Sequence, residues 1–323
     1  MSKPIIVTGA AGFIGRNAVA ALNARGHTNL LLVDLLGTDE KWKNLRGLKY
    51  EELLNPDQFL KLVTEKRLEA AEAIIHLGAC SATTERNADY LLENNYRYTR
   101  TLCEWSLANK VRFVYASSAA TYGDGSKGYS DDDRVTPTLR PLNMYGYSKH
   151  MFDLWALKHG LLDRIVGLKY FNVFGPYEDH KADMRSVVQK SYHQIQQQGE
   201  VALFKSYKPE YGDGEQKRDF VYVKDAVDVT LHFALDSTRG GLLNCGTGQA
   251  RTWKDLALAV FKAMNVPPKI KFIEMPEVLR GKYQYFTEAD SKKLRATGYV
   301  APFMSLEDAV KDYVTSYLLV VED

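Results

Sequence analysis

Tyr145 and Lys149 stand four residues apart in the stretch Tyr-Gly-Tyr-Ser-Lys, a spacing that places both on one face of a helix. A phenol with an ordinary pKa of ~10 is a poor base at neutral pH. A lysine ammonium one helical turn away stabilises the phenolate, so the tyrosine can take a proton from an alcohol and return it to a carbonyl. Ser118, 27 residues earlier, ends a strand-like run, where its hydroxyl can bond the reacting oxygen. The three residues predict acid–base chemistry at an alcohol carbon.

A glycine-rich turn near the N-terminus predicts a second component of that chemistry. Gly9, Gly12 and Gly15 form the pattern G-x-x-G-x-x-G directly after the apolar run Ile5–Thr8 and before a helix-like stretch. In that context the glycines allow a tight turn, a close approach of the backbone to a pyrophosphate, and close packing of helix on strand. The N-terminus of the helix offers N–H donors to the phosphates. We therefore expect a dinucleotide site whose nicotinamide exchanges hydride at the carbon served by Tyr145.

Asp34 stands 19 residues after Gly15, at the end of the second apolar run, where a carboxylate meets the adenosine ribose. A carboxylate favours NAD because it repels a 2′-phosphate. Lys41, Lys43 and Arg46 follow soon after and could hold that phosphate, or they form an ordinary solvated face. These residues leave both NAD and NADP open.

Short apolar runs separated by helix-like stretches must position these groups. Continuous apolar runs of this length mark parallel strands buried on both faces. Helices are predicted between them, notably from Gly15 to Arg25 and from Tyr90 to Asn109. The alternation predicts an α/β fold with a doubly wound parallel sheet of the Rossmann type. The predicted strands are Ile5–Thr8, Leu30–Val33, Ala73–Leu77, Arg112–Ala116 and Ile165–Tyr170.

The second half of the chain is less regular. The polar stretch Tyr207–Gln216 predicts an exposed loop, and an amphipathic helix is predicted from Thr252 to Met264. We expect residues 1–171 to form the dinucleotide-binding domain, and residues 172–323 to form mainly a smaller α/β substrate-binding domain. Strands near residues 220–245 are expected to return to the sheet of the first domain.

The composition excludes several classes of function. The 323 residues are 45% hydrophobic and 25% charged, as in ordinary globular proteins, and the formal charge of +2 gives no basis for nucleic-acid binding. Cys80, Cys103 and Cys245 are far apart and odd in number, so neither a disulfide framework nor a metal site is predicted. No apolar run approaches the ~18 residues of a spanning helix. We expect a cytoplasmic protein that acts on a small molecule, away from membranes.

Several blocks together resemble the extended short-chain dehydrogenase/reductase family of nucleotide-sugar enzymes. The glycine pattern, Ser118, Tyr145 and Lys149 match it, and so does the block Arg-Asp-Phe-Val-Tyr-Val at residues 218–223, followed by Asp225. Within the family, the chain is most similar, over nearly its whole length, to enzymes that epimerise ADP-heptose at C6. The blocks that carry this similarity are Gly78–Ser81, Thr83–Glu85, Asn94–Tyr96, Ser117–Gly123, Tyr145–Lys149, Phe171–Pro176, His180–Lys181, Tyr283–Gln284 and Phe286–Thr287.

The resemblance implies an isomerase with two bases. Hydride leaves C6, the ketone turns over in the site, and hydride returns to the other face, so each face needs its own proton acceptor and donor. Tyr145 matches one base and Lys181 the other, with Ser118 and Lys149 completing the catalytic set. A lysine serves as a base only if its pKa is brought toward neutrality; the alternative for Lys181 is a phosphate or surface lysine.

The resemblance also implies the ligands and the assembly. The implied cofactor is NADP, with NAD as the alternative, and the implied substrate is ADP-heptose, which supplies the heptose of lipopolysaccharide. The implied assembly is a homo-oligomer, a pentamer being one form. The implied cofactor contacts are Gly9, Gly12, Phe13, Ile14, Gly15, Asp34, Lys41, Leu77, Gly78, Ala79, Cys80, Ser81, Asn94, Lys149, Val173 and Lys181. The implied substrate contacts are Ser118, Asn172, Asp183, Lys190, Phe204, Lys205, Ser206, Arg218 and Tyr283.

Arg218 fits a diphosphate clamp, because a guanidinium binds phosphate oxygens in pairs; a salt bridge with Asp219 or Asp225 is the alternative. Departures from the family pattern at Asp183 and Lys190, near Pro56 and in the 207–216 loop weaken the NADP assignment and the sugar contacts.

Three other functions are weighed against this one. A UDP-hexose 4-epimerase would share Ser118, Tyr145 and Lys149 but has no need of Lys181. A sugar 4,6-dehydratase presents Asp-Glu after the strand, where this chain has Ala119–Ala120. A non-catalytic dinucleotide sensor usually loses the tyrosine or the lysine, and this chain keeps both.

Overall fold

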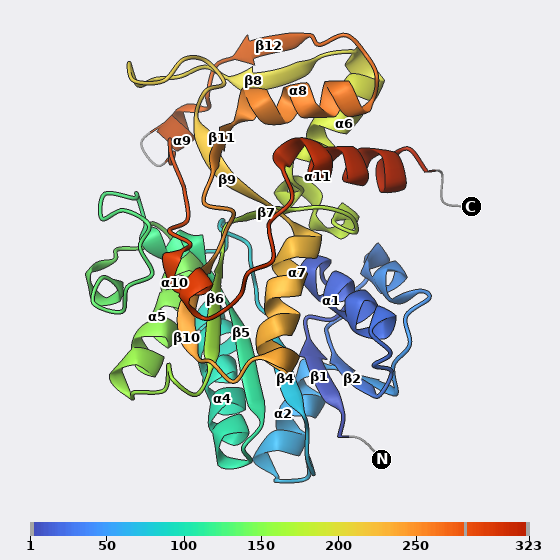
Figure 1. The fold of residues 1–323 in the computed structure, drawn as a ribbon, viewed down its shortest axis with the longest axis vertical. Helices are drawn as coiled ribbons and strands as arrows, with labels where there is room; N and C mark the ends of the chain where they lie inside the picture. The colour runs from blue at the N-terminus through green and yellow to red at the C-terminus, as the bar shows by residue number, and fades with distance from the viewer. Residues whose placement is uncertain (1–2, 281–282, 321–323) are drawn as a thin grey trace.

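The computed structural model describes residues 3–280 and 283–320, and its centre is a seven-stranded sheet in the order β10-β6-β5-β4-β1-β2-β3 (Figure 1). Every pairing in this sheet is parallel. Parallel strands place all their carboxyl ends along one edge, where ligands bind in folds of this kind. The strands are β1 (Ile5–Thr8), β2 (Leu30–Val33), β3 (Glu52–Leu54), β4 (Ala73–His76), β5 (Arg112–Ser118), β6 (Val166–Tyr170) and β10 (Gly241–Cys245).

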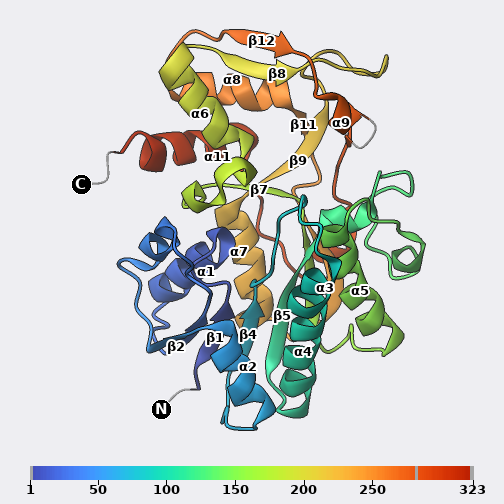
Figure 2. The same ribbon diagram turned by 180° about the vertical axis from the view of Figure 1, so that it is seen from behind.

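Helices cover both faces of this sheet (Figures 1 and 2). Alternate side chains of a strand point to opposite faces, so Ile5 and Val7 join the core beneath α1 (Phe13–Ala24) and α7 (Val223–Leu231). Ile6 instead joins the core beneath α2 (Pro56–Thr64), α4 (Tyr98–Ala108) and α5 (Met144–Lys158). Burial on both faces explains why the strands are continuously apolar, and it confirms the predicted doubly wound α/β fold.

A second group of elements lies beyond the carboxyl ends of the large sheet, in the upper part of Figure 1. It contains a three-stranded sheet in the order β11-β9-β7 and a two-stranded sheet of β12 and β8. Its strands are β7 (Asn172–Phe174), β8 (Val201–Phe204), β9 (Lys217–Tyr222), β11 (Ala250–Thr252) and β12 (Ile270–Ile273). The helices of this half of the chain, apart from α7, are α6 (Val187–Gln198), α8 (Trp253–Ala263), α9 (Glu277–Arg280), α10 (Lys292–Ala296) and α11 (Leu306–Tyr313).

The strands near residues 220–245 do not all lie where the sequence predicts. β10 lies at the edge of the large sheet, parallel to β6. β9 instead pairs with β7 and β11 in the three-stranded sheet, so its expected return to the large sheet is wrong. Both strands are short and largely buried, and strand composition does not reveal which partner a strand will take.

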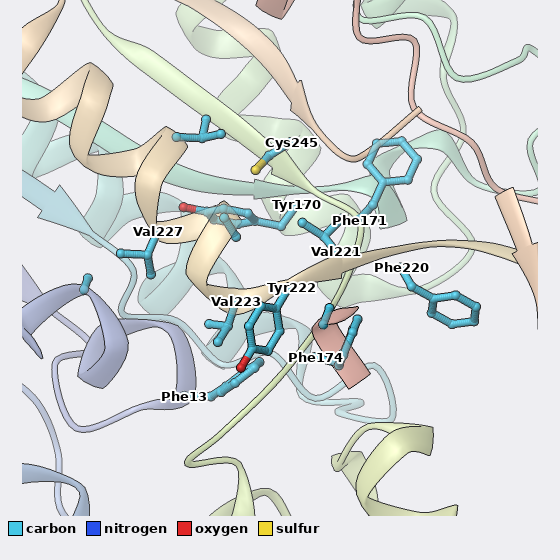
Figure 3. Close-up of a cluster of buried hydrophobic side chains, with 14 of the residues drawn as sticks. Phe13, Tyr170, Phe171, Phe174, Phe220, Val221, Tyr222, Val223, Val227 and Cys245 are labelled. Carbon is cyan, nitrogen blue, oxygen red and sulfur yellow. The ribbon is translucent and has the colours of Figure 1, made fainter. Parts of the chain in front are cut away.

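An apolar cluster joins the two groups of elements (Figure 3). Phe13, at the start of α1, belongs to the same buried core as Phe174 of β7 and Tyr222 of β9. The rings of Phe174 and Tyr222 lie 5.5 Å apart. In the same core, the Tyr170 hydroxyl lies 2.6 Å from the hydroxyl of Thr230. Close packing of this kind resists deformation, so the glycine turn and the segment after β7 are held in a fixed relation.

The predicted helix from Tyr90 to Asn109 is interrupted. It consists of α3 (Ala88–Leu91), a π-helical turn (Leu92–Arg97) and α4. The turn carries Asn95, whose side chain bonds the backbone N–H and C=O of Cys80 and the hydroxyl of Ser148. π-helical turns of this kind often occur near functional sites. The other short helical segments are Glu40–Leu45, Ala119–Tyr122, Thr136–Thr138, Asp179–Met184, His232–Asp236 and Val314–Leu318.

Candidate active site

A cavity of about 830 Å³ opens at the carboxyl ends of the large sheet and extends to the second group of elements. A smaller hollow of about 210 Å³ continues from it beside Asp34 and Gly78. The larger cavity brings together most of the predicted cofactor residues: Gly9, Gly12, Phe13, Ile14, Gly15, Asp34, Lys41, Leu77, Gly78, Ala79, Ser81, Lys149, Val173 and Lys181. The predicted catalytic residues Ser118 and Tyr145 also line it, as does Asn172. Cys80 and Asn94 line the smaller hollow.

The glycine turn is built as the sequence predicts. Gly9 has φ of +69°, and a Cβ there would lie 2.6 Å from the backbone nitrogen of Gly78. A Cβ on Gly15 would lie 1.9 Å from the carbonyl oxygen of Gly9, so the helix could not pack this closely with any side chain. A Cβ on Gly12 would meet the same oxygen at 3.1 Å and otherwise point into open space. Gly12 is also the N-cap of α1, with no side chain bonding the first N–H groups. Those donors are therefore available to a phosphate.

The different surroundings of Gly12 and Gly15 predict different results for their alanine variants. Gly12→Ala is expected to fold normally and to bind the dinucleotide at least about tenfold more weakly, because its methyl group occupies the space a pyrophosphate would enter. Gly15→Ala is expected to lower the thermal unfolding midpoint, since overpacking typically costs ~1–3 kcal/mol. Titration of each variant with NADP and NAD, together with thermal unfolding, makes the comparison. Unchanged cofactor affinity in a folded Gly12→Ala would refute the phosphate assignment.

The negative charge of Asp34 is compensated by backbone N–H groups and by a lysine. One carboxylate oxygen accepts the backbone N–H of Ala11 at 2.7 Å. The other accepts the N–H of Leu35 at 2.7 Å and the ammonium of Lys41 at 2.6 Å. Lys43 pairs instead with Glu40 on the exposed 3₁₀ helix. Of the two lysines, only Lys41 faces the ribose end of the cavity.

The end of β5 and the start of α5 place Ser118 beside Tyr145. Asn143 caps α5 by accepting the N–H of Gly146 at 2.8 Å. A Cβ on Gly146 would lie 2.8 Å from the carbonyl oxygen of Ala120, so only glycine lets the helix start this close to the strand end. Removal from water raises the pKa of the Tyr145 phenol, and a hydrogen bond with Ser118 opposes that rise. The serine therefore favours the phenolate, as catalysis by Tyr145 requires.

Asp153 is a buried residue of this site that the sequence reasoning missed. Its carboxylate accepts the hydroxyls of Tyr115 at 2.9 Å and Ser117 at 2.7 Å, and it lies 4.0 Å from the ammonium of Lys169. Burial lowers the pKa of Lys149 to about 8, and the charge of Asp153 opposes the fall. Asp153 thus helps to keep Lys149 protonated at neutral pH. Its position four residues after Lys149, on the same helix face, was the available signal.

Lys181 lines the same cavity from the segment after β7, on the 3₁₀ helix Asp179–Met184. Its ammonium lies 4.9 Å from the ring centre of Phe13 and 3.8 Å from a carboxylate oxygen of Glu178. Burial lowers its pKa, and Glu178 opposes that change. His180 is 3.2 Å from the amide of Asn44, which also bonds the carbonyl of Ala11 in the glycine turn. The segment that carries Lys181 is therefore fastened to the cofactor side of the cavity.

The remaining predicted substrate residues lie outside the lining of the cavity. Arg218 sits between the rings of Trp253 (5.6 Å) and Tyr283 (5.1 Å). The carboxylates of Asp219 and Asp225 accept backbone N–H groups instead. Among the described residues, neither carboxylate forms an ion pair with Arg218. The rings of Phe204 and Tyr283 lie 6.4 Å apart in the same aromatic group.

The other four substrate predictions, Asp183, Lys190, Lys205 and Ser206, also lie outside the cavity lining. Lys205 pairs with Glu274 at 2.7 Å, and Ser206 donates to the carbonyl of Lys208. Lys190 donates to the carbonyl of Asp183 at 2.7 Å, and the side chain of Asp183 is exposed. In this arrangement these groups bind one another rather than face the cavity.

Several lining residues were not predicted from the sequence. Arg185, Ser186 and Val187 follow Lys181 along the chain and face the cavity, and Trp253 faces it from α8. No local motif marks them, because they meet the cavity only through the packing of the second group of elements. Within residues 3–280 and 283–320, no group of three or more His, Cys, Asp or Glu side chains could hold a metal ion. No helix of the same residues is long and apolar enough to cross a membrane.

Comparisons with known proteins by sequence and by structure agree with one another. The sequence model of the NAD dependent epimerase/dehydratase family matches residues 5–246. A Nitratidesulfovibrio vulgaris protein named ADP-L-glycero-D-manno-heptose-6-epimerase is 54% identical, with 97% of each chain covered. A Fusobacterium nucleatum protein of the same name is 47% identical, covering 97% of this chain and 98% of its own. The crystal structure of the Helicobacter pylori protein of that name superposes with a TM-score of 0.84 at 27% identity, covering 99% of this chain and 97% of its own.

Proposed function

The chain belongs to the NAD dependent epimerase/dehydratase family, and we propose that it interconverts ADP-D-glycero-D-manno-heptose and ADP-L-glycero-D-manno-heptose by oxidation and re-reduction at C6. Relatives that share nearly its whole length carry the corresponding epimerase name. The observation that carries the proposal is that Tyr145 and Lys181, from two different groups of elements, line one cavity together with the glycine turn. An epimerisation through a ketone needs one proton-transferring group for each face, and this cavity offers two.

The residues fit a nicotinamide dinucleotide. Gly12 leaves the first N–H groups of α1 uncapped beside open space, and Asp34 lies at the end of β2, where the adenosine ribose binds in this fold. Lys149 lines the same cavity as the glycine turn and Tyr145. When bound there, the dinucleotide supplies the hydride acceptor and donor.

Side chains of the protein transfer the protons. On one face, Tyr145 takes the proton of the C6 hydroxyl, assisted by the Lys149 ammonium and by the hydrogen bond with Ser118. The ketone then turns within the cavity. On the other face Lys181 donates the proton to the new alcohol; the reverse direction exchanges the two roles. Burial lowers the pKa of Lys181, which is the direction that proton acceptance by Lys181 in the reverse reaction requires.

Parallel incubations with ADP-D-glycero-D-manno-heptose and with UDP-glucose test the assignment, the products being separated by chromatography. We expect conversion of the heptose alone, without net consumption of cofactor. In deuterated water, C6 should gain no deuterium, because the same hydride returns to it. Conversion of UDP-glucose alone would favour a 4-epimerase, and deuterium at C6 would indicate deprotonation of carbon. An absence of turnover with any nucleotide sugar would favour a dinucleotide sensor.

For the cofactor we propose NADP, with NAD as the alternative. Lys41 neutralises Asp34 directly, so the ribose end of the cavity does not present an uncompensated negative charge to a 2′-phosphate. An ammonium has three N–H donors, and Lys41 uses two of them, on Asp34 and on the carbonyl of Leu35. A third donor is available to a phosphate oxygen.

Lys41→Ala is accordingly expected to weaken NADP binding by about 10- to 100-fold, the range for a hydrogen bond to a charged group, and to weaken NAD binding much less. Dissociation constants for both cofactors give the measurement. Lys43→Ala is the matched control, because Lys43 pairs with Glu40 on an exposed helix and should leave the ratio unchanged. An equal loss for NAD and NADP in Lys41→Ala would contradict the assignment, as would extraction of NAD alone from the purified protein.

A cytoplasmic location stays a prediction from the composition, and a homo-oligomeric assembly stays a prediction from the sequence resemblance. Division of the chain at residue 171 stays a prediction as well.

A further inference from the structure

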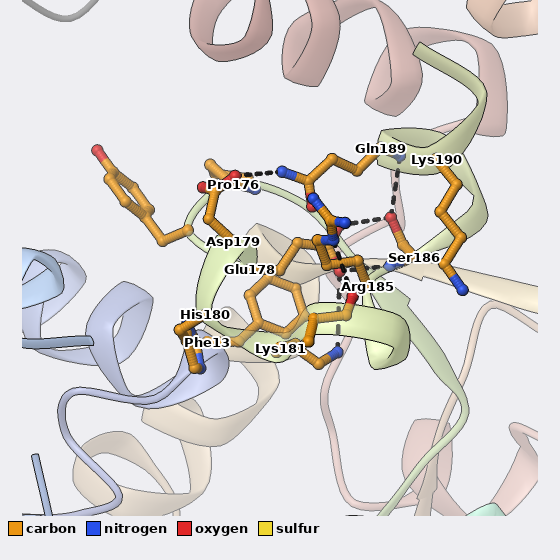
Figure 4. A network of polar contacts seen from close by, with 12 residues as sticks. Phe13, Pro176, Glu178, Asp179, His180, Lys181, Arg185, Ser186, Gln189 and Lys190 are labelled. Atoms are coloured by element: carbon orange, nitrogen blue, oxygen red, sulfur yellow. Dashed lines mark hydrogen bonds and ion pairs between the residues drawn. The ribbon is translucent and has the colours of Figure 1, made fainter. Parts of the chain in front are cut away.

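Glu178 is a fully buried carboxylate directly beside Lys181 (Figure 4). One of its oxygens accepts the backbone N–H of Ser186 at 2.7 Å and lies 3.8 Å from the ammonium of Lys181. The other accepts the hydroxyl of Ser186 and, at 3.2 Å, the hydroxyl of Tyr313 on α11. Its side chain is 0% exposed, whereas that of Lys181 is 22% exposed. The carboxylate thus stands behind the lysine, away from the cavity.

Such a residue needs an explanation, because a buried ion is costly unless charge and hydrogen bonds compensate it. Ser186 already has a simple structural role as the N-cap of α6. A hydroxyl or amide could have bonded Ser186 and Tyr313 without the desolvation penalty of a carboxylate. What a carboxylate adds at this position is negative charge next to Lys181: burial raises the pKa of Glu178, and Lys181, Ser186 and Tyr313 oppose that rise.

The backbone between Glu178 and Ser186 adopts an uncommon conformation. Ala182, immediately after Lys181, has φ of +45°, a region that side chains other than glycine rarely adopt. The carbonyl of Ala182 accepts the guanidinium of Arg185 at 2.8 Å. Glu178 bonds Ser186 on the far side of this turn, so it closes the segment into a loop whose middle presents Lys181 to the cavity (Figure 4).

Few other charges act on Lys181. Lys190, from α6, lowers its pKa together with burial, and His180 precedes it on the same segment with a pKa that is itself lowered by burial. The neighbouring α1 contributes the uncharged ring of Phe13, and α11 contributes the phenol of Tyr313. Glu178 is the group that raises the pKa of Lys181. Removing its charge is therefore expected to favour the neutral amine.

We propose that Glu178 is a positioning residue for Lys181, which it holds at the cavity and keeps in the ammonium form that donates the proton on the second face. The role of Lys181 in catalysis rests on the proposed function, whereas the effect of Glu178 on the protonation of Lys181 does not. The two can be tested separately.

The first test measures the protonation of Lys181 directly in the full-length protein. Trace acetic anhydride labels neutral amines, and mass spectrometry gives the rate for each lysine over a series of pH values. Glu178→Gln keeps the shape of the side chain, and the hydroxyls of Ser186 and Tyr313 can turn to accept its amide N–H groups. Labelling of Lys181 near pH 7 is expected to rise by about tenfold or more, the effect of losing an opposite charge within about 4 Å.

The chain offers a matched control at the same distance. Lys61 of α2 and Glu65, the residue that caps the C-terminus of that helix, also lie 3.8 Å apart, but their side chains are 68% and 43% exposed. Water screens such a pair, so Glu65→Gln should leave the labelling of Lys61 almost unchanged. Glu178→Asp retains the charge at a greater separation and should raise the labelling of Lys181 in the same direction by a smaller factor. An unchanged rate for Lys181 in either folded Glu178 variant overturns the proposal.

The second test uses turnover. If the proposed function holds, Glu178→Gln should lower kcat more than it raises KM, and the fall in activity on the alkaline side should move to lower pH, because Lys181 loses its proton earlier. Glu178→Asp should restore part of both. A loss confined to thermal stability, with a wild-type pH profile, would show that Glu178 has a structural role only. Absence of epimerase activity in the wild-type protein would refute the proposed function and leave the labelling result to decide the role of Glu178.

Discussion

Replacing Tyr145 with phenylalanine is expected to lower the epimerisation rate by about 10²- to 10⁴-fold, the usual effect of losing a positioned acid–base group. The ring of phenylalanine fills the same space, so the fold and cofactor binding should be retained. What is lost is the hydroxyl, whose proton loss the hydrogen bond with Ser118 favours. Lys149, one turn further along the same helix, is the proposed stabiliser of the phenolate. Steady-state rates with ADP-D-glycero-D-manno-heptose at saturation give the measurement.

The same helix provides the control for this experiment. Tyr147 stands two residues further on and its side chain is 48% exposed, so it points away from the site. Tyr147→Phe should keep the wild-type rate. If Tyr145→Phe also kept a near-normal rate with the heptose, the assignment of Tyr145 as a base would be wrong.

Lys181→Met is expected to reduce epimerisation as severely as Tyr145→Phe, because the second face of the ketone then has no proton donor and no alternative route exists. Methionine keeps much of the aliphatic length that lies along Phe13 and removes the ammonium. If Lys181 served only to bind phosphate, the variant would show a raised KM and almost normal turnover at saturating substrate. Near-normal turnover at saturation would therefore refute the two-base mechanism.

A substrate analogue with an aldehyde at C6 separates the two bases further. Two such aldehydes can dismutate, one being oxidised while the other is reduced, so the slow first oxidation is bypassed. Tyr145→Phe and Lys181→Met should each retain part of this dismutation, since each keeps one functional face. The double variant should retain none. A double variant as active as either single one would mean that a third group transfers the proton.

The two bases differ in how the fold supports them. Tyr145 and Lys149 lie on one helix, and Asp153, one turn beyond Lys149, carries the buried counter-charge. Lys181 lies on a single 3₁₀ turn whose shape depends on contacts with α6 and α11. Substitutions in α11 that disturb Tyr313 are therefore expected to act on the Lys181 face more than on the Tyr145 face.

Local sequence determined much of this protein. The apolar runs predicted β1, β2, β4, β5 and β6 of the large sheet, because strands buried on both faces are largely apolar; the short, partly exposed edge strand β3 was not predicted. The glycine pattern predicted the turn before α1, since Gly9 and Gly15 stand where a side chain would collide with backbone. The four-residue spacing of Tyr145 and Lys149 predicted their common helix face. In each case the cause acts between residues close in the chain.

Tertiary structure alone decided the rest. β9 left the large sheet for β7 and β11, and Lys205, Ser206 and Lys190 turned to neighbouring protein groups. Glu178 acquired its place beside Lys181 through Ser186 and through Tyr313, which is 135 residues away in the chain. Burial and charge pairing of this kind depend on which surfaces meet when the layers pack, and sequence spacing carries no record of such distant contacts. The physical reason is that a buried carboxylate becomes favourable only after its donors, from separate elements, have been brought around it.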